Sequence, residues 1–265
     1  MLHHIENKIY HVEILPPKQD TEKLTADLAL FADKYNKALE IGSCICLTDN
    51  AMGNLAFQGT EVIEELELPV KSDQVMIHLN TFHTLEDLKN ILDKCKALGI
   101  KYLLVISGDG SDRLPKLQAA DLNLTDTTTV TSVELLSYIH REYPNEFILG
   151  VAFNPYEPAE HEFHKLERKL KAGAAFIVTQ PVIESNEIIN QLLNLYPAIP
   201  VVIEAWMSKK LHLLSEAVGY EIPENTEFDP VETLKMLHKI YPNCGVYLSL
   251  LSFKTQFDLL SETWI

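Results

Sequence analysis

The chain has 265 residues and lacks features that mark several common classes of protein. No apolar run approaches the ~20 residues that span a bilayer, so a membrane-spanning helix is not expected. Lys and Arg number 22 against 38 Asp and Glu, a net charge of −16. This acidic balance argues against nucleic acid or an anionic membrane as a partner. The N-terminus lacks the basic and apolar regions of a signal peptide, so we expect a cytoplasmic protein.

The sequence also lacks the cysteine, histidine and glycine patterns that mark redox, metal and dinucleotide-binding sites. None of the cysteines forms a CxxC pair, and in a cytoplasmic chain free buried thiols are expected; they are Cys44, Cys46, Cys95 and Cys244. His161 and His164 have i,i+3 spacing, but no carboxylate or cysteine pattern completes a metal site, so no metal is predicted. The GDG of residues 108–110 is not GxGxxG, so a dinucleotide fingerprint is missing.

The composition is that of a folded chain with a sizeable core. Apolar residues make up 46% and charged residues 23%, which makes disorder improbable. No linker, low-complexity tract or block of like charge divides the chain. We therefore expect one domain over residues 1–265, a length at which α/β barrels commonly form a single domain.

Strand and helix patterns alternate along the whole chain. Segments rich in β-branched and other apolar residues predict strands at Ile9–Leu15, Glu40–Leu47, Gln74–Leu79, Tyr102–Ile106, Phe147–Ala152, Phe176–Thr179, Val201–Ile203 and Gly245–Leu248. Helical spacing predicts helices at Thr21–Leu39, Leu85–Leu98, Thr131–Arg141, Glu160–Ala172, Ile183–Leu195, Lys209–Ala217, Pro230–Ile240 and Phe253–Leu260. Eight such units favour a closed (β/α)₈ TIM barrel, and an open doubly wound sheet is the alternative.

Polar side chains follow nearly every predicted strand. In such barrels ligands bind at the carboxyl ends of the strands, where the sequence has Glu13, Thr48, His78, Asp109, Asn154, Gln180, Glu204 and Ser249. Glu13 lies among apolar neighbours, and desolvation there would raise its pKa toward that of a general acid. An ion pair with Lys18 explains a carboxylate at this position equally well. Glu204 could bind substrate or pair with Lys209 or Lys210, and we favour the ion pair.

Several motifs occur in the order seen in one known family. They are Glu13–Lys18 (EILPPK), Leu47–Asn50, His78-Leu79, Ile106–Asp109 (ISGD), Gly150–Pro155 and Leu166–Gln180 (LERKLKAGAAFIVTQ). This series resembles the methylenetetrahydrofolate reductases over roughly the first 180 residues. The ISGD and Asn154-Pro155 variants most resemble the subgroup found in acetogens and in fusions with homocysteine methyltransferase.

The resemblance implies a flavin-dependent barrel of one-carbon metabolism. It would reduce 5,10-methylenetetrahydrofolate to 5-methyltetrahydrofolate through non-covalent FAD, with NAD(P)H as the electron donor. Glu13 would be the general acid, and Asp109 would lie beside the flavin and the pterin. Gln180 would bind the substrate. The resemblance further implies that Thr48, His78, Thr131 and Phe153 line the flavin and that Arg168 and Lys169 meet its diphosphate.

Other interpretations of these residues stay open. Arg168 and Lys169 lie on a helix face that solvent alone would explain, and Asp109 could be a turn aspartate. The sequence departs from the family pattern at Ser107, at Phe153–Tyr156 and in the late segment Leu248–Ser252. These departures motivate an alternative: a non-reductase barrel that binds a pterin or a protein partner in methyl transfer.

The sequence also allows partners beyond the folate. A homo-oligomer is compatible with the apolar ending Trp264-Ile265. A flavoprotein working with an electron-transfer or methyltransferase partner is a further possibility.

Overall fold

The computed structural model describes residues 1–71, 73–125, 127–223, 225–250 and 253–257. The ending Trp264-Ile265, the late residues Leu251 and Ser252, and the last part of the helix predicted to reach Leu260 lie outside these residues. Eight parallel strands are hydrogen-bonded in sequence order and close into a barrel. The predicted TIM barrel is therefore confirmed.

The strands begin and end close to the predicted bounds. They are β1 (Tyr10–Ile14), β2 (Cys44–Leu47), β3 (Val75–Leu79), β4 (Tyr102–Val105), β5 (Ile148–Phe153), β6 (Phe176–Pro181), β7 (Val201–Trp206) and β8 (Gly245–Ser249). Their side chains are almost all buried, as expected for parallel strands that are covered on both faces. The largest difference is in β2, which starts at Cys44 because Gly42 takes a positive φ of 77° and ends the preceding turn.

The helices also follow the predicted periodicity. They are α2 (Leu24–Glu40), α4 (Leu85–Ala97), α5 (Ser132–Glu142), α6 (Ala159–Lys171), α7 (Glu187–Leu195), α8 (Leu211–Val218), α9 (Pro230–Ile240) and α10 (Phe253–Phe257). Sequence analysis missed α1 (Leu2–Glu6), α3 (Gly59–Glu65) and the 3₁₀ turns η1 (Ala51–Gly53) and η2 (Ala119–Leu122). Each of these elements is too short to show a helical apolar stripe.

The chain divides into two compact units. Unit 1 comprises Met1–Glu13, Ala152–Leu166 and Phe176–Ile265, and unit 2 comprises Ile14–Val151 and Glu167–Ala175. The single domain over 1–265 stays a prediction, and the two units are described separately.

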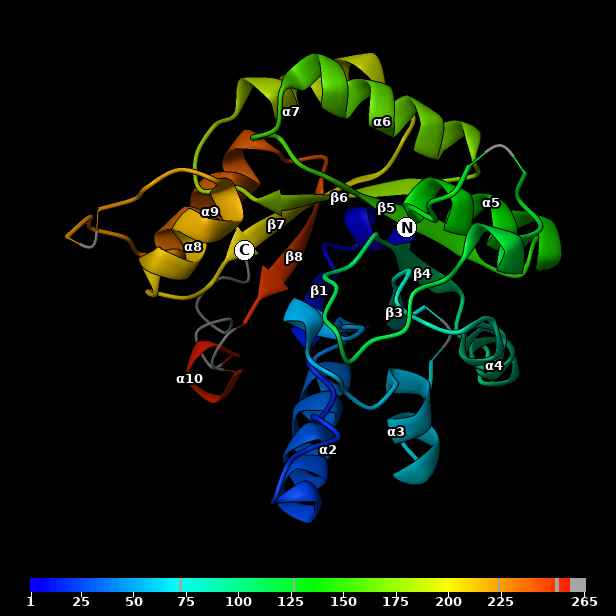
Figure 1. The fold of residues 1–265 in the computed structure, drawn as a ribbon. Coiled ribbons are helices and arrows are strands. Elements are labelled where there is room, and N and C mark those ends of the chain that lie inside the picture. Colours follow the sequence, from blue (N-terminus) through cyan, green and yellow to red (C-terminus); the bar gives the residue numbers. More distant parts are fainter. Residues whose placement is uncertain (72, 126, 224, 251–252, 258–265) are drawn as a thin grey trace. The chain divides into compact units, whose positions relative to one another are not determined.

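In unit 1, β6, β7 and β8 lie side by side, and α8 and α9 pack against β6 and β7 (Figure 1). An apolar cluster of Trp206, Leu211, Leu214, Val218 and Ile222 joins β7 to α8. This packing fixes the strand that carries Glu204.

The N-terminus of unit 1 is ordered. A frayed pair at His3-His4 is the natural interpretation of the sequence, but His4 is fully buried in α1. Its Nδ1 is 3.0 Å from Nε2 of His11 in β1. The fold therefore holds the N-terminus in place through His4, whose burial no local sequence pattern indicated.

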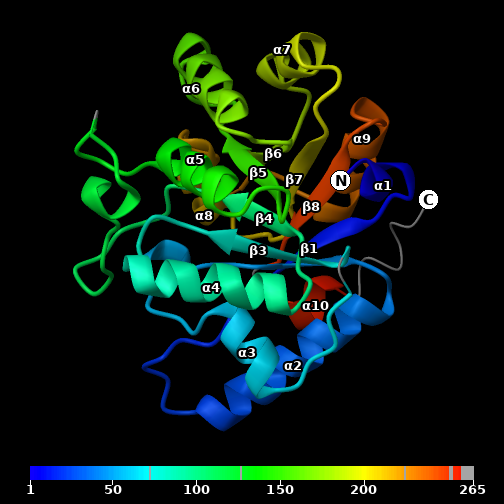
Figure 2. The same cartoon turned by 90° about the vertical axis from the view of Figure 1, so that its right-hand side faces the viewer.

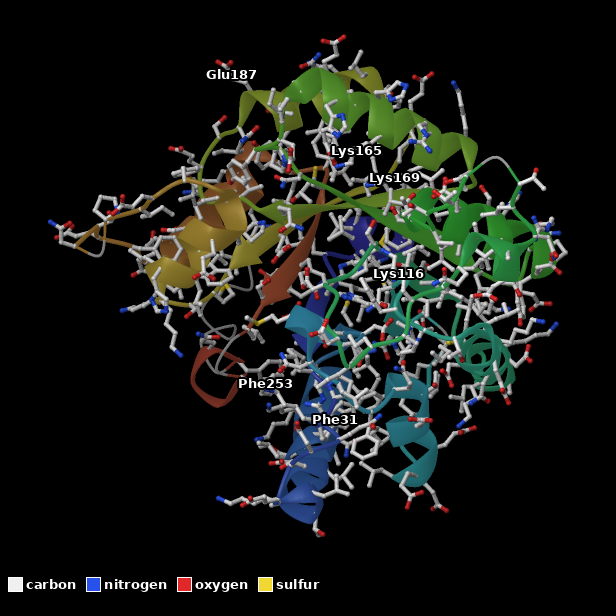
Figure 3. All side chains as sticks on the ribbon, viewed as in Figure 1. Phe31, Lys116, Lys165, Lys169, Glu187 and Phe253 are labelled. Atoms are coloured by element: carbon white, nitrogen blue, oxygen red, sulfur yellow. The ribbon has the colours of Figure 1, made fainter. Side chains whose placement is uncertain are left out.

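In unit 2, β2, β3 and β4 are adjacent in the sheet. Helix α3 lies beside α4, and α5 packs against β4 (Figure 2). Phe31, marked in Figure 3, is a buried residue of α2, which packs on β2. The helices predicted at Leu85–Leu98 and Thr131–Arg141 begin at the capping residues Thr84 and Thr131, because each of these side chains accepts a hydrogen bond from a backbone N–H of the first turn.

Candidate functional site

Glu13 is the partly exposed residue of an otherwise buried strand, β1. Its neighbours Val12 and Ile14 are buried, and its Oε2 accepts a hydrogen bond of 2.6 Å from the hydroxyl of Tyr247 in β8. Desolvation raises the pKa of Glu13, and the Tyr247 hydroxyl partly offsets that rise. The proposed alternative partner, Lys18, donates instead to Oδ1 of Asn54 at 2.8 Å.

Glu204 in β7 is a second carboxyl group of unit 1. One of its oxygens accepts a hydrogen bond from the hydroxyl of Ser249. The expected ion pair with Lys209 or Lys210 is wrong: within the residues that the structure describes, neither lysine forms an ion pair with Glu204. The prediction was wrong because both lysines follow the strand in sequence, whereas the Glu204 side chain meets Ser249 in β8. Only the tertiary structure brings Ser249 to Glu204.

The surroundings of Glu204 raise its pKa. Desolvation, and then the negative charge of Glu13, raise the pKa of Glu204 to about 8, while the Ser249 hydrogen bond opposes the rise. Parallel strand register places Glu204 opposite Tyr247, the residue that donates to Glu13. The structure therefore brings two carboxyl groups and two hydroxyl groups together at β1, β7 and β8.

Gln180 lies near the end of β6, which runs two residues further than predicted. The pairing of β6 with β7 shifts between Val178 and Pro181, as in a bulge that redirects a strand-end side chain. Next to it, the Thr179 hydroxyl accepts a hydrogen bond from the Glu204 amide at 3.1 Å. Gln180 is partly exposed, and its substrate-binding role stays a prediction.

Unit 2 holds a different acidic group, Asp49, at the end of β2. Its Oδ2 accepts hydrogen bonds from the backbone N–H of Asn80 at 2.8 Å and from Nε2 of His83 at 2.7 Å. Its Oδ1 accepts from the side chains of Asn50 at 3.2 Å and Gln58 at 3.4 Å. Asp49 lies within the motif Leu47–Asn50, but no sequence signal indicates that it organises a buried network.

The ISGD motif packs against this network. Gly108 has φ +77°, and a Cβ at this position would be 2.6 Å from Cβ of Asn80. Asn80 itself donates to the backbone oxygen of Asp49 at 2.8 Å. The glycine of the motif is therefore required by close packing as well as by its backbone conformation. Asp109, the next residue, is exposed.

The residues predicted to contact FAD fall into two sets. Thr48 and His78 are buried at neighbouring strands of unit 2. Desolvation lowers the pKa of His78 to about 4, so its ring is neutral at pH 7. Two uncharged, buried polar side chains on neighbouring strands fit the uncharged part of a flavin.

The predicted diphosphate residues fit less well. Arg168 is half-exposed, and its Nη2 is 3.4 Å from Oε1 of Glu134. Glu134 also accepts a hydrogen bond of 2.8 Å from the backbone N–H of Thr131, whose side chain caps α5. Lys169 is buried on the last turn of α6 (Figure 3). Because the Glu134 carboxylate already neutralises Arg168, a phosphate that binds Arg168 would have to displace Glu134.

Phe153 belongs to unit 1 and is fully buried. Its ring centroid lies 5.5 Å from that of Phe163 in α6, so its ring is packed within the core. Its predicted contact with a flavin is not visible in this packing and stays a prediction.

The fold and these strand ends define the class of protein: a (β/α)₈ barrel with an acidic site on β1, β7 and β8. The chain belongs to the methylenetetrahydrofolate reductase family, whose model matches residues 1–238. It is 25% identical over 173 residues to a probable methylenetetrahydrofolate reductase (NADPH) of Caenorhabditis elegans, over 60% of this chain and 25% of the relative. The chain thus aligns with about a quarter of that relative's length.

A solved structure has a similar fold. It is an uncharacterized protein from Clostridium thermocellum that binds two copies of 5-methyl-5,6,7,8-tetrahydrofolic acid, with a TM-score of 0.60 and 14% sequence identity. The alignment covers 97% of this chain and 94% of that chain. In the described part of this chain, no helix is long and apolar enough to cross a membrane.

Proposed function

We propose that this protein binds a reduced folate and reduces 5,10-methylenetetrahydrofolate to 5-methyltetrahydrofolate, with FAD as hydride carrier and NAD(P)H as electron donor. Family membership supports this activity. The single observation that carries it is the acidic site in which Tyr247 donates to Glu13 and Ser249 donates to Glu204. We further propose a cytoplasmic location.

The acidic site supplies what this reaction requires from the protein. The five-membered ring that bridges the two nitrogens of the folate opens when one nitrogen is protonated and its bond to the bridging carbon breaks. A carboxyl group with a raised pKa holds a proton near neutral pH and can release it to a nitrogen. Both Glu13 and Glu204 have raised pKa values, so unit 1 has proton donors suited to this step.

The other site residues would bind and orient the ligands. The Gln180 amide, partly exposed at the end of β6, can both donate to and accept from a pterin. Exposed Asp109 could accept from the pterin's N–H donors. FAD, when bound, would supply the hydride, and Thr48 and His78 would contact its uncharged ring system. Arg168 and Lys169 would meet its phosphates once Arg168 leaves Glu134.

Absorption spectroscopy and half-reactions test this proposal. Purified protein should be yellow, should bleach with NAD(P)H and should recolour with 5,10-methylenetetrahydrofolate. Glu13→Gln should slow the folate half-reaction by roughly 100-fold or more, as expected for loss of acid–base function, and leave flavin reduction nearly intact. The control is Glu184→Gln, an exposed residue after β6, which should behave as wild type. Equal losses in both half-reactions would contradict the role of Glu13.

A second function is favoured by the contacts of the predicted phosphate residues. Because Arg168 already forms an ion pair with Glu134, we propose an alternative function. In it the barrel binds a pterin without reducing it and acts in methyl transfer with a partner protein. The folate bound by the Clostridium thermocellum protein supports this alternative. Colourless protein that gains thermal stability from 5-methyltetrahydrofolate but not from FAD would favour it, because a ligand that binds the native state stabilises the fold.

Assembly can be tested on the same preparation. A homo-oligomer would give a mass in solution above that of one chain. Copurification of a second chain would indicate an electron-transfer or methyltransferase partner.

A further inference from the structure

We propose that unit 1 has a second binding site, which takes a small organic carboxylate with an apolar body. The site is a cavity of about 250 Å³ between α1, α9 and the first residues of β1 and β8. This site is independent of the proposed function, because it lies at the amino ends of these strands. Glu13 and Ser249, in contrast, are near their carboxyl ends.

The cavity is formed by elements of unit 1 that come together at the start of β8. Helix α1 lies beside β8 (Figure 2), and the last turn of α9 completes the wall. Ile5, Ile9 and Val246 give part of this wall an apolar surface. An apolar cavity of about 150 Å³ holds benzene. The larger cavity in unit 1 can therefore hold a ring or a branched chain that carries an acidic group.

The charged groups of the cavity wall are cationic. Lys8 and Lys239 line the cavity, and no aspartate or glutamate does so among the residues that the structure describes. Within the same residues, neither lysine forms an ion pair. Both are exposed, so their ammonium groups can reach a ligand at the mouth of the cavity. Two cations without a carboxylate partner favour the binding of an anion.

The backbone at Lys8 is held in an unusual conformation. Its φ is 51°, in the left-handed region where glycine or asparagine commonly follows a helix. The N–H of Lys8 donates to the carbonyl of Ile5 at 3.1 Å, and the N–H of Ile9 donates to that of His4 at 2.8 Å. The end of α1 thus fixes Lys8 at the cavity wall. A role for its side chain accounts for a lysine where glycine would be unstrained.

A neutral polar pair forms the rest of the wall. Oη of Tyr10 is 2.7 Å from Nε2 of His238. Burial, and then the positive charge of Lys8, lower the pKa of His238, so its ring is neutral at pH 7. The remaining titratable groups of the wall are Lys239 and the Cys244 thiol, which stays neutral because burial raises its pKa to about 12. An anion in the cavity would therefore meet cations and neutral groups only.

The cations of α9 also have a structural role to be separated from ligand binding. His238 and Lys239 lie in the last turn of this helix, where positive charge favours the negative end of the helix dipole. That role changes the stability of the free protein and predicts no response to an added carboxylate. Ligand binding is therefore the property that tests the site.

Thermal unfolding of the full chain with benzoate tests the chemical class of the ligand. Benzoate should raise the Tm, because a ligand that binds the native state stabilises the fold. Benzamide has the ring without the charge, and acetate has the charge without the ring, so each should raise the Tm much less at the same concentration. No shift with benzoate overturns the proposal. An equal shift with benzamide or acetate, or a larger one with inorganic phosphate, also overturns it.

Paired lysine substitutions locate the site. Lys8→Gln/Lys239→Gln should weaken benzoate binding, measured by calorimetry, roughly 10-fold or more, as expected for the loss of hydrogen bonds to a charged group. Lys209→Gln/Lys210→Gln is the matched control, because it removes two exposed lysines elsewhere in unit 1 and changes the net charge equally. The control should bind benzoate as wild type does. Equal affinities in the two double variants overturn the proposal.

NMR of the His238 ring gives a local measurement. Its signals, assigned with His238→Gln, should titrate with a pKa below the usual value in the free protein. Saturating benzoate should raise this pKa, because a nearby anion favours the charged imidazolium. Lys8→Gln should raise it without benzoate, because a positive neighbour is removed. A pKa of His238 that saturating benzoate leaves unchanged would show that benzoate binds elsewhere, and it overturns the proposal.

Discussion

Unit 1 and unit 2 each contain acidic side chains at strand ends, and the two sets are supported differently. In unit 2, Asp49 accepts hydrogen bonds from Asn50, Gln58, Asn80 and His83. In unit 1, one hydroxyl group each donates to Glu13 and Glu204. Many donors stabilise a carboxylate and tie it to the structure, whereas desolvation with few donors favours the protonated acid.

This difference separates a carboxyl group that the fold holds by many donors from one whose capacity to accept hydrogen bonds is partly open. Asp49 joins the segments after β2 and β3, and its four partners leave it little capacity for a ligand. Glu13 and Glu204 keep unused lone pairs and raised pKa values. A carboxylate at a barrel strand end is therefore a catalytic candidate only when its hydrogen-bonding capacity is not already filled.

The largest expected effect comes from removing the structural acid. Asp49→Ala should lower the free energy of unfolding by about 3–5 kcal/mol, because it leaves His83 and the Asn80 N–H buried without their acceptor. Urea denaturation measures the change. Asp20→Ala, which removes an exposed ion pair with Arg113, is the control and should leave the free energy of unfolding nearly unchanged. A similar small cost at Asp49 would break the comparison.

The next effect is a pH dependence in unit 1. Because the folded pKa of Glu204 is raised to about 8, the folded state binds more protons than the unfolded state between pH ~4.5 and 8. Wild-type stability relative to Glu204→Gln should fall across this window, by on the order of 3 kcal/mol, and level off above it. Thermal unfolding of both proteins from pH 4 to 9 measures it. A difference that is constant with pH would show that Glu204 titrates normally.

A pair of glycines sharpens the account of the Asp49 network. Gly99→Ala should cost about 1 kcal/mol, because its φ of +72° is strained for alanine but nothing lies within 4 Å of the new Cβ. Gly108→Ala should lower the free energy of unfolding by about 2–3 kcal/mol, because its new Cβ would clash with Asn80 in addition to the backbone strain. Equal costs, measured by urea denaturation, would mean that Asn80 moves aside freely.

The smallest effect is expected at the surface of unit 2. Arg168→Gln should change the free energy of unfolding by less than about 1 kcal/mol, since its ion pair with Glu134 is half-exposed. If Arg168 meets a diphosphate, the variant should also lose part of the thermal stabilisation given by FAD. Lys171→Gln, which breaks the exposed pair with Glu167, is the matched control and should keep that stabilisation in full.

Much of the fold was predictable because long, regular patterns dominate the sequence. The apolar runs from Tyr10–Ile14 to Gly245–Ser249 predicted all the strands of the barrel, and capping residues such as Thr131 marked helix starts. Short elements such as α1 and α3 were missed, because they have too few residues for a period to emerge.

The candidate site was only partly predictable. Glu13 stood out because apolar neighbours along β1 imply desolvation, an effect that is local in sequence. The predicted partner of Glu204 was wrong for the opposite reason. Lys209 and Lys210 are near Glu204 in sequence, but its hydrogen-bond partner, Ser249, is 45 residues away.

The sequence alone determined the barrel, the order of its strands and the motifs that give family membership, because these depend on periodicity and on local residue order. Only the tertiary structure decided which acids accept hydrogen bonds from many donors and which accept from a single hydroxyl group. That choice depends on how many donors reach each carboxyl group, and the donors come from strands and loops that the chain brings together only on folding.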